Sequence, residues 1–350
     1  MKKIIAVLLL MSMLFSLVAC APPEVKNAEP AATTEAAVTP EAPAKVYKVG
    51  AVFTGPALDG GWNEGCFKGL KIMQDELGYE THYTDNIKQS DDESIIRQYA
   101  EQGYDLIIGH GWEYGPALEK VAKEYPDLHF LQTGGDAGGK APNLASGVFT
   151  TGELGFLLSE VAAKLTKTNS TGFIAGFELP TIVGEYDMMR YTVPFLNPKA
   201  KAEAIYTGSW TDVAKTKETA KVMIDKGVDV IFGINNACDA GTIQALQESG
   251  KDVFFLGWSG DWHDAGPDVV ATSGVQSFGV ILKLVGESVQ KGTFEGKMKS
   301  YGIKEGASSL GTWSSKVPEN VKNEVMADFE KFKTGEYTME TVNKMIGFTK

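Results

Sequence analysis

The body of the chain runs through one pattern twice. From residue 46 onward, short β-rich segments alternate with helical stretches of about ten to fifteen residues. This alternation is typical of parallel sheets that carry helices on both faces. It runs once to about residue 150 and starts again after Gly152. The sequence therefore predicts an α/β fold with two doubly wound lobes.

Hydrophobic period and turn residues give the bounds of the expected elements. In the first run we expect strands at 45–53, 79–84, 104–109, 128–133 and 144–149, and helices at 62–77, 92–102 and 115–124. In the second run we expect strands at 171–176, 202–206, 228–234, 253–257 and 269–273, and helices ending at 165, starting after 180 and spanning 212–226. The tail at 317–350 is expected to form one or two peripheral helices.

The first twenty residues have the layout of a secretory signal. Lys2 and Lys3 precede an apolar stretch at 4–18, which is too short to cross a bilayer comfortably as a helix. Leu-Val-Ala at 17–19 stands before Cys20, and small residues before a cysteine resemble the lipidation signal of bacterial lipoproteins. We expect residues 1–19 to be removed and Cys20 to be lipidated on the extracytoplasmic face of the cell membrane. An uncleaved N-terminal anchor would also place the body outside the cytoplasm.

The segment that follows is predicted to be a tether. Residues 21–45 contain eight Ala, five Pro, no aromatic residue and no Gly. Such a composition buries too little apolar surface to offset the entropy of an ordered chain. We therefore expect 20–45 to be disordered and to hold the folded body near the membrane.

Composition limits the partners of this chain. The 350 residues are 43% hydrophobic, and 45 Asp and Glu against 33 Lys and Arg give a net charge of -12. A soluble globular body of two domains fits these values, whereas an acidic protein lacks the basic surface that nucleic acid requires. Cys66 and Cys238 follow no metal or redox spacing and are expected to be free thiols. We expect a monomer.

Ligands of open α/β sheets bind beyond the carboxyl ends of the strands, so the loops after the strands are the candidate site. Four of the six tryptophans fall in these loops, among carboxylates and amides: Trp62, Trp112, Trp258 and Trp262. Flat aromatic faces beside hydrogen-bonding side chains are typical of sites for planar or ring-shaped polar ligands. The alternative is that some of these indoles only seal the loops onto the sheet.

Motifs for catalysis, cofactors and metals are missing. The segment GGDAGGKA at 134–141 is one residue short of a phosphate-binding loop and is expected to be a turn between strands. The sequence has no HExxH and no GxSxG, and Asp261, His263 and Asp264 lack a spacing that would put them on one helix face. We therefore expect no enzyme, cofactor or metal, with His110 as a candidate hydrogen-bonding residue in the cleft and His82 and His129 as structural strand residues.

Seven short motifs, in this order and spacing, resemble the basic membrane protein family of solute-binding lipoproteins, whose relatives bind purine nucleosides or nucleobases for ABC transporters. The motifs are Asp59-Gly-Gly-Trp-Asn63, 102–109, 121–126, 207–212, 226–232, 256–257 leading to Asp261, and 272–273. The resemblance covers about residues 46–284. It implies a type I periplasmic-binding fold with three crossings between the lobes and a ligand cleft between them. We expect 46–150 plus about 276–311 in lobe 1, and 151–275 plus about 312–350 in lobe 2.

The resemblance also implies site residues. Trp62 is similar to the aromatic residue that stacks on the base, and Asn63 to the amide beside it. Asp59 and the loop from Trp112 to Tyr114 match the family's contacts in the first lobe. The matches in the second lobe are Asn235 or Asp239 and Asp261.

This chain departs from the family at two positions. Gln276 stands where nucleoside binders have a lysine, which weakens the case for a ribose. Glu185 stands where they have an aromatic residue, which weakens two-sided stacking unless Trp258 or Tyr186 substitutes. We therefore expect a purine nucleoside or nucleobase, with Trp258 among the contacts.

The resemblance implies a solute-binding lipoprotein that closes its lobes on a small polar ring compound and delivers it to an ABC permease. Two alternatives stay open. One is a binder of sugars or other ring-shaped solutes, since tryptophan faces also suit pyranoses. The other is a membrane-tethered sensor that presents its ligand-bound form to a signalling partner.

Overall fold

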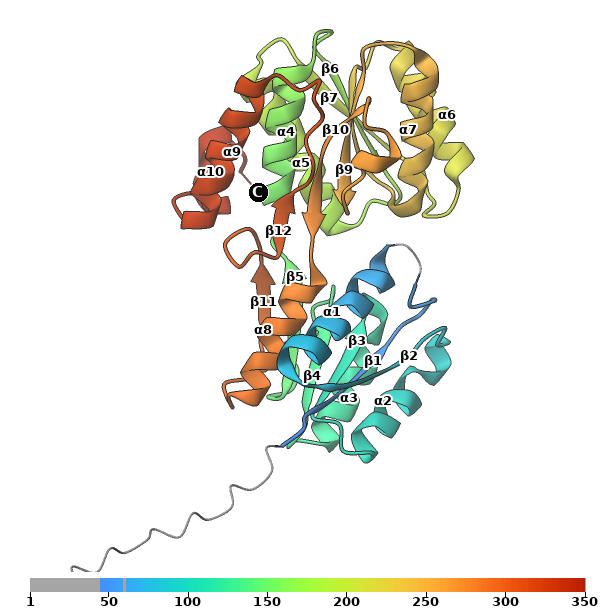
Figure 1. Cartoon of the computed structure of the whole chain (residues 1–350), viewed down its shortest axis with the longest axis vertical. Coiled ribbons are helices and arrows are strands. Elements are labelled where there is room, and N and C mark those ends of the chain that lie inside the picture. The colour runs from blue at the N-terminus through green and yellow to red at the C-terminus, as the bar shows by residue number, and fades with distance from the viewer. Residues whose placement is uncertain (1–44, 59–60, 350) are drawn as a thin grey trace, which may run out of the picture. The chain divides into compact units, whose positions relative to one another are not determined.

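The computed structural model describes residues 45–58 and 61–349 (Figure 1). The predicted signal, Cys20 and all of the predicted tether except Lys45 lie outside this range. The described chain forms two six-stranded sheets, each with helices on both faces. This confirms the predicted two-lobed α/β fold.

The first sheet is parallel throughout, and its order is β11-β5-β4-β3-β1-β2. Its strands are β1 (Lys48–Val52), β2 (Glu80–Thr84), β3 (Leu106–His110), β4 (His129–Thr133), β5 (Leu144–Phe149) and β11 (Met298–Tyr301). Side chains alternate between its faces. Ile108 and Leu131 pack under α1 (Trp62–Leu77) and α8 (Phe278–Gln290), whereas Ile107 and Phe130 pack under α2 (Asp92–Glu101) and α3 (Gly115–Glu124).

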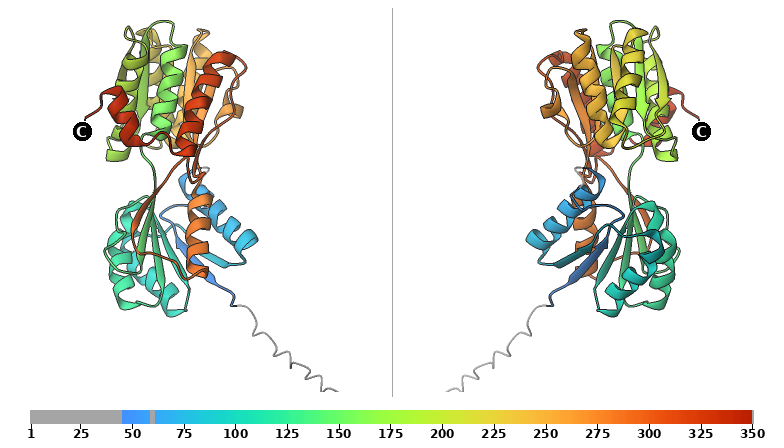
Figure 2. Two further views of the ribbon diagram at one scale, coloured as in Figure 1. Left: turned by 90° about the vertical axis from the view of Figure 1, so that its left-hand side faces the viewer. Right: turned by 90° about the vertical axis from the view of Figure 1, so that its right-hand side faces the viewer.

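The second sheet has the order β12-β10-β9-β8-β6-β7, in which only β12 runs antiparallel to its neighbour. Its strands are β6 (Ser170–Ala175), β7 (Lys201–Tyr206), β8 (Val230–Ile234), β9 (Phe254–Ser259), β10 (Val270–Gln276) and β12 (Ser308–Leu310). Helices α4 (Glu153–Leu165), α5 (Pro180–Leu196), α9 (Glu319–Thr334) and α10 (Met339–Ile346) pack on one face, and α6 (Val213–Asp225) and α7 (Asp239–Ser249) on the other. Figure 2 shows both layers from the side.

Three segments of the chain connect the two sheets: β5 to α4, β10 to α8, and β11 to β12. Backbone hydrogen bonds join these segments. The Thr150 amide in the first donates to the Tyr301 carbonyl at the start of the third at 3.0 Å, and the Ser277 amide in the second donates to the Ala307 carbonyl in the third at 2.8 Å. The last return was expected at about residue 312. Strand β12, at Ser308–Leu310, already belongs to the second sheet and places the return a few residues earlier.

Most of the predicted elements are present, including both tail helices, the turn between β4 and β5, and the strand positions of His82 and His129. Cys66 and Cys238 are free, as predicted, and both are buried. Four elements were not predicted from the sequence: α7, α8, β11 and β12. The two strands have only four and three residues and read MKSY and SSL, which is too short and too polar for a hydrophobic period to identify.

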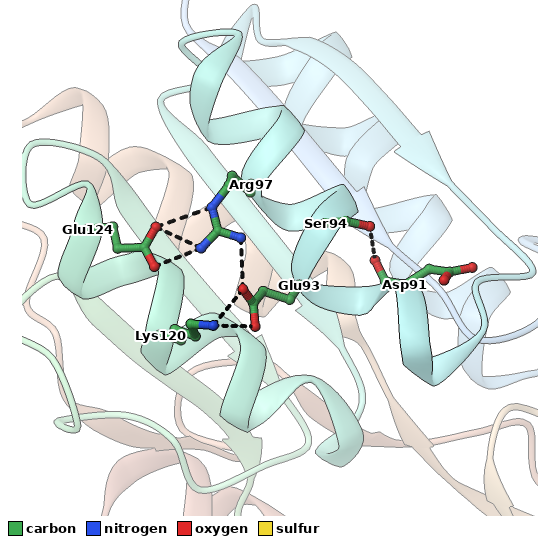
Figure 3. A network of polar contacts seen from close by, with 6 residues as sticks. All are labelled: Asp91, Glu93, Ser94, Arg97, Lys120 and Glu124. Carbon is green, nitrogen blue, oxygen red and sulfur yellow. Dashed lines mark hydrogen bonds and ion pairs between the residues drawn. The ribbon is translucent and has the colours of Figure 1, made fainter.

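A surface network ties α2 to α3 (Figure 3). The Arg97 guanidinium donates to Glu93 at 2.8 Å and to Glu124 on α3 at 2.7 Å, and Lys120 on α3 pairs with Glu93 at 2.8 Å. A single exposed ion pair contributes little to stability, but Arg97 binds Glu124 in a bidentate manner and shares Glu93 with Lys120. It fixes α3, whose first turn follows the loop that carries Trp112.

Glu160 is a buried carboxylate between α4 and α9. Its side chain is 5% exposed, and it pairs with Lys164 at 3.5 Å, which also binds Glu324 of α9. Burial and then the charge of Asp328 raise the pKa of Glu160 to about 7, although Lys164 opposes this shift. The folded protein therefore binds more protons at this site than the unfolded chain between about pH 4.5 and pH 7.

We predict that the free energy of unfolding contains a contribution from Glu160 that is complete below about pH 4.5 and is lost as the pH rises through about 7. Glu160→Gln should flatten this part of the pH dependence and be more stable than the wild type at pH 8. Urea unfolding at a series of pH values measures it. Glu340→Gln, on an exposed position of α10, is the control. Parallel curves for wild type and Glu160→Gln would contradict the prediction.

Candidate ligand-binding site

The loops at the carboxyl ends of both sheets enclose two neighbouring cavities, of about 410 and 400 Å³. Both are within the range of small-molecule sites, about 300–1,000 Å³. The first cavity is lined by residues of both lobes and by the crossing segment at Thr150 and Thr151. Trp62, Asn236, Trp258, Ser259 and Gln276 line both cavities.

Trp62 begins α1 and forms the first-lobe wall shared by both cavities. Its indole stacks on the His110 imidazole, with ring centres 4.8 Å apart and planes inclined by 26°. The ring of Phe278 meets it edge-on at 4.7 Å. These contacts orient an indole that is still 38% exposed, so a ligand ring can lie against it.

His110 lies beneath Trp62 and is fully buried. One ring nitrogen is 2.6 Å from the Thr133 hydroxyl, and the other is 2.9 Å from the Trp62 carbonyl oxygen. His110 lines neither cavity. In this conformation it supports the aromatic wall.

Three further tryptophans line the first cavity: Trp112, Trp210 and Trp258. Trp112 is 70% exposed in the turn after β3, whereas Trp258 lies near the end of β9, with its ring centre 5.5 Å from that of Phe232. Trp210 follows β7 and covers Gly176 so closely that a Cβ there would lie 2.3 Å from the indole. Trp210 was not predicted from the sequence to lie at the cavity, although the rule that ligands bind beyond the carboxyl ends of the strands applies equally to the loop after β7.

Glu185 lies on α5 and lines the first cavity with a side chain that is almost fully buried. Its Oε1 accepts a hydrogen bond from the Gly152 amide at 2.9 Å. Its Oε2 has no hydrogen bond of ordinary geometry to any described residue. Burial raises the pKa of this carboxyl to about 8, which outweighs the opposing effect of the Gly152 and Gly155 amides.

Asp261 lines the second cavity and is tied to the return segment after β12. Its Oδ2 accepts from the Thr312 amide at 2.9 Å and from the Thr312 hydroxyl at 2.6 Å, and its Oδ1 accepts from the His263 amide at 3.1 Å. Burial acts to raise the pKa of Asp261, but these hydrogen bonds outweigh it and the pKa is lowered. The ionised carboxylate therefore holds the loop after β9 in place.

The structure thus brings Trp62, Trp112, Glu185, Trp258 and Gln276 to the first cavity, and Asp261 to the second. Five other predicted site residues line neither cavity: Asn63, His110, Tyr114, Asn235 and Asp239. The remaining one, Asp59, lies outside the described residues. The Asn63 amide donates to the Pro56 carbonyl at 3.3 Å and holds the loop after β1. Tyr114 is fully buried in the core under α3.

Asn235 and Asp239 lie beneath the loop after β8. Both are fully buried, and the backbone amide of Asn235 donates to Asp239 Oδ2 at 3.1 Å. Burial raises the pKa of Asp239 to about 7. It is the neighbouring Asn236 that lines both cavities, so the pair supports the loop from below.

Within residues 45–58 and 61–349, no group of three or more His, Cys, Asp or Glu side chains is placed to hold a metal ion. In the same part of the chain, no helix combines the length and the apolar character needed to cross a membrane.

Known proteins resemble this chain over most of its length. A transcriptional activator protein, Med, of Bacillus subtilis is 29% identical over 83% of this chain and 90% of its own length. A purine-binding protein of Brucella abortus is 27% identical over 83% of this chain and 81% of its own length.

A solved structure of an ABC transporter solute-binding protein from Conexibacter woesei is 26% identical. It covers 84% of this chain and 98% of its own, with a TM-score of 0.70. The family model described as ABC transporter substrate-binding protein, PnrA-like, matches residues 46–343, which include both lobes and both cavities. The chain therefore belongs to the PnrA-like family of ABC transporter substrate-binding proteins.

Proposed function

We propose that this protein captures a purine nucleobase or nucleoside outside the cytoplasm and delivers it to an ABC importer. The ligand lies in the first cavity, with its ring against Trp62, and the two lobes close around it. Lipidated Cys20 holds the protein on the membrane beside its permease.

One observation carries this proposal. The Trp62 indole is held by His110 and Phe278 at the wall of a ligand-sized cavity that is lined from both lobes. A preoriented indole suits a planar heteroaromatic ring, because stacking loses little side-chain entropy. The purine-binding relative, which is similar over both lobes, supports the choice of purines.

We predict that Trp62→Ala weakens binding of the preferred purine by about tenfold to a hundredfold, because base–indole stacking contributes about 1–3 kcal/mol. Mass spectrometry of compounds released on denaturation, followed by calorimetry with adenine, guanine, adenosine, guanosine and glucose, identifies the ligand and measures this loss.

Trp313→Phe is the matched control, since Trp313 packs on the core of the second lobe and lines neither cavity. Its purine affinity should equal that of the wild type. Binding of glucose but of no purine would reject the purine ligand and favour the sugar-binding alternative.

We predict that the ligand brings the lobes together. Both lobes contribute side chains to the first cavity, and the three crossing segments are the natural hinge. Small-angle X-ray scattering should therefore give a smaller radius of gyration with saturating ligand than without it. An unchanged value in the presence of measured binding would argue against closure.

We predict that Cys20→Ala moves the protein from the membrane fraction to the soluble fraction. Acyl chains on Cys20 would supply about 0.8 kcal/mol for each buried CH₂, and the acidic body offers no electrostatic attraction to anionic lipid. Cell fractionation and immunoblotting measure the distribution. A variant that stays in the membrane fraction would indicate an uncleaved anchor instead of a lipid.

A further inference from the structure

We infer that the preferred occupant of the first cavity is a ring-shaped organic cation, whose charge lies between the tryptophan faces and the Glu185 carboxylate. This inference rests on the proposed function in one respect, namely that a ring-shaped ligand occupies this cavity. It goes further by naming the charge of that ligand.

The charges that line the cavity are of one sign. Among the described residues, its lining contains two carboxylates, Glu113 and Glu185, and no Lys, Arg or His. Lys68, a basic residue close by, lines only the second cavity. An anionic ligand would therefore meet like charge, whereas a cation would be attracted by Glu113 and by Glu185 in its ionised form.

Four indoles surround the same space. Trp62 and Trp112 come from the first lobe, and Trp210 and Trp258 from the second. The face of an indole is the most favourable aromatic surface for a cation, and the attraction strengthens when water is excluded. Stacking alone would also suit a neutral ring. The preference for a cation over a neutral ring therefore depends on the carboxylates.

Glu185 is the carboxylate that favours a cation over a neutral ring. It is 4% exposed, and its Oε2 has no hydrogen-bond partner of ordinary geometry among the described residues. A buried carboxylate with one unpartnered oxygen is costly when it is ionised, and a ligand cation beside that oxygen would compensate for this cost. A neutral ligand would leave the charge uncompensated or would require the carboxyl to stay protonated.

Protonation offers an independent measurement. Without a ligand, burial and then the charge of Glu153 on α4 raise the pKa of Glu185 to about 8. The Gly152 and Gly155 amides act in the opposite direction. Glu113 is the other acidic residue that lines the cavity. A bound cation favours the ionised form and lowers this pKa. Binding at pH 7 should therefore release protons, and the calorimetric enthalpy should depend on the ionisation enthalpy of the buffer.

The test uses pairs of compounds that differ in charge but hardly in shape. 1-Methyladenosine is a cation at pH 7, and N6-methyladenosine is its neutral counterpart; 1-methylnicotinamide and N-methylnicotinamide form a second pair that contains no purine. We expect the wild-type protein to bind the cation of at least one pair about tenfold more tightly than its neutral counterpart.

In Glu185→Gln, which keeps the size of the side chain and removes its charge, this preference should fall to near parity and proton release should cease. Glu178→Gln, an exposed position just before α5 that lines neither cavity, should keep both. Thermal unfolding of each variant checks that it is folded.

The outcomes separate this inference from the proposed function. Tighter binding of 1-methyladenosine supports both. Tighter binding of 1-methylnicotinamide, with no purine bound, supports the cationic ligand and rejects the purine. Binding of purines without a preference for the cation, or with one that Glu185→Gln retains, overturns the inference and leaves the proposed function intact. Failure of both cations to bind overturns the inference.

Discussion

Everything at the site depends on how three crossing segments are held together between the sheets. Glu153, the first residue of α4, accepts a hydrogen bond from the Ile303 amide at 2.8 Å and so joins the first crossing to the third. Gly302 lies so close to this carboxylate that a Cβ would come within 2.2 Å of it. Because the crossings meet here, the carboxyl ends of both sheets converge on the same space and every loop that follows a strand can contribute to one site.

The second feature of the site is that many of its polar side chains hold the surrounding backbone and side chains in place. His110, Asn63, Asn235 and Asp239 belong to the residue types that bind ligands, yet each of them forms hydrogen bonds with the backbone or with neighbouring side chains. Buried polar groups need such partners, and satisfying them rigidifies the loop. The residues that line the cavity, such as Trp62 and Asn236, are therefore positioned by a layer of polar side chains beneath them.

This layering explains what could be predicted from the sequence. The strand and helix alternation was sufficient for the two-lobed fold, because parallel α/β units have a strong hydrophobic period. The loop rule located Trp62, Trp112 and Trp258. It could not separate Asn235 from Asn236, since neighbouring residues of a short turn point in different directions and only the backbone geometry decides which one reaches the cavity. Tyr114 illustrates the same limit, because its ring packs inward against the helix that follows it.

Glu185 and Gln276, the two departures from the family pattern, both lie at the cavity, and they change its chemistry in the same direction. A lysine at position 276 would place a cation in the lining, where the structure has a neutral amide at the end of β10. An aromatic residue at position 185 would remove a carboxylate. Relative to the nucleoside-binding pattern, the two residues remove a positive charge from the lining and add a carboxyl group that is negatively charged when it is ionised. Since the indoles remain, the cavity keeps the capacity to stack on a ring while its electrostatic preference shifts towards positive charge.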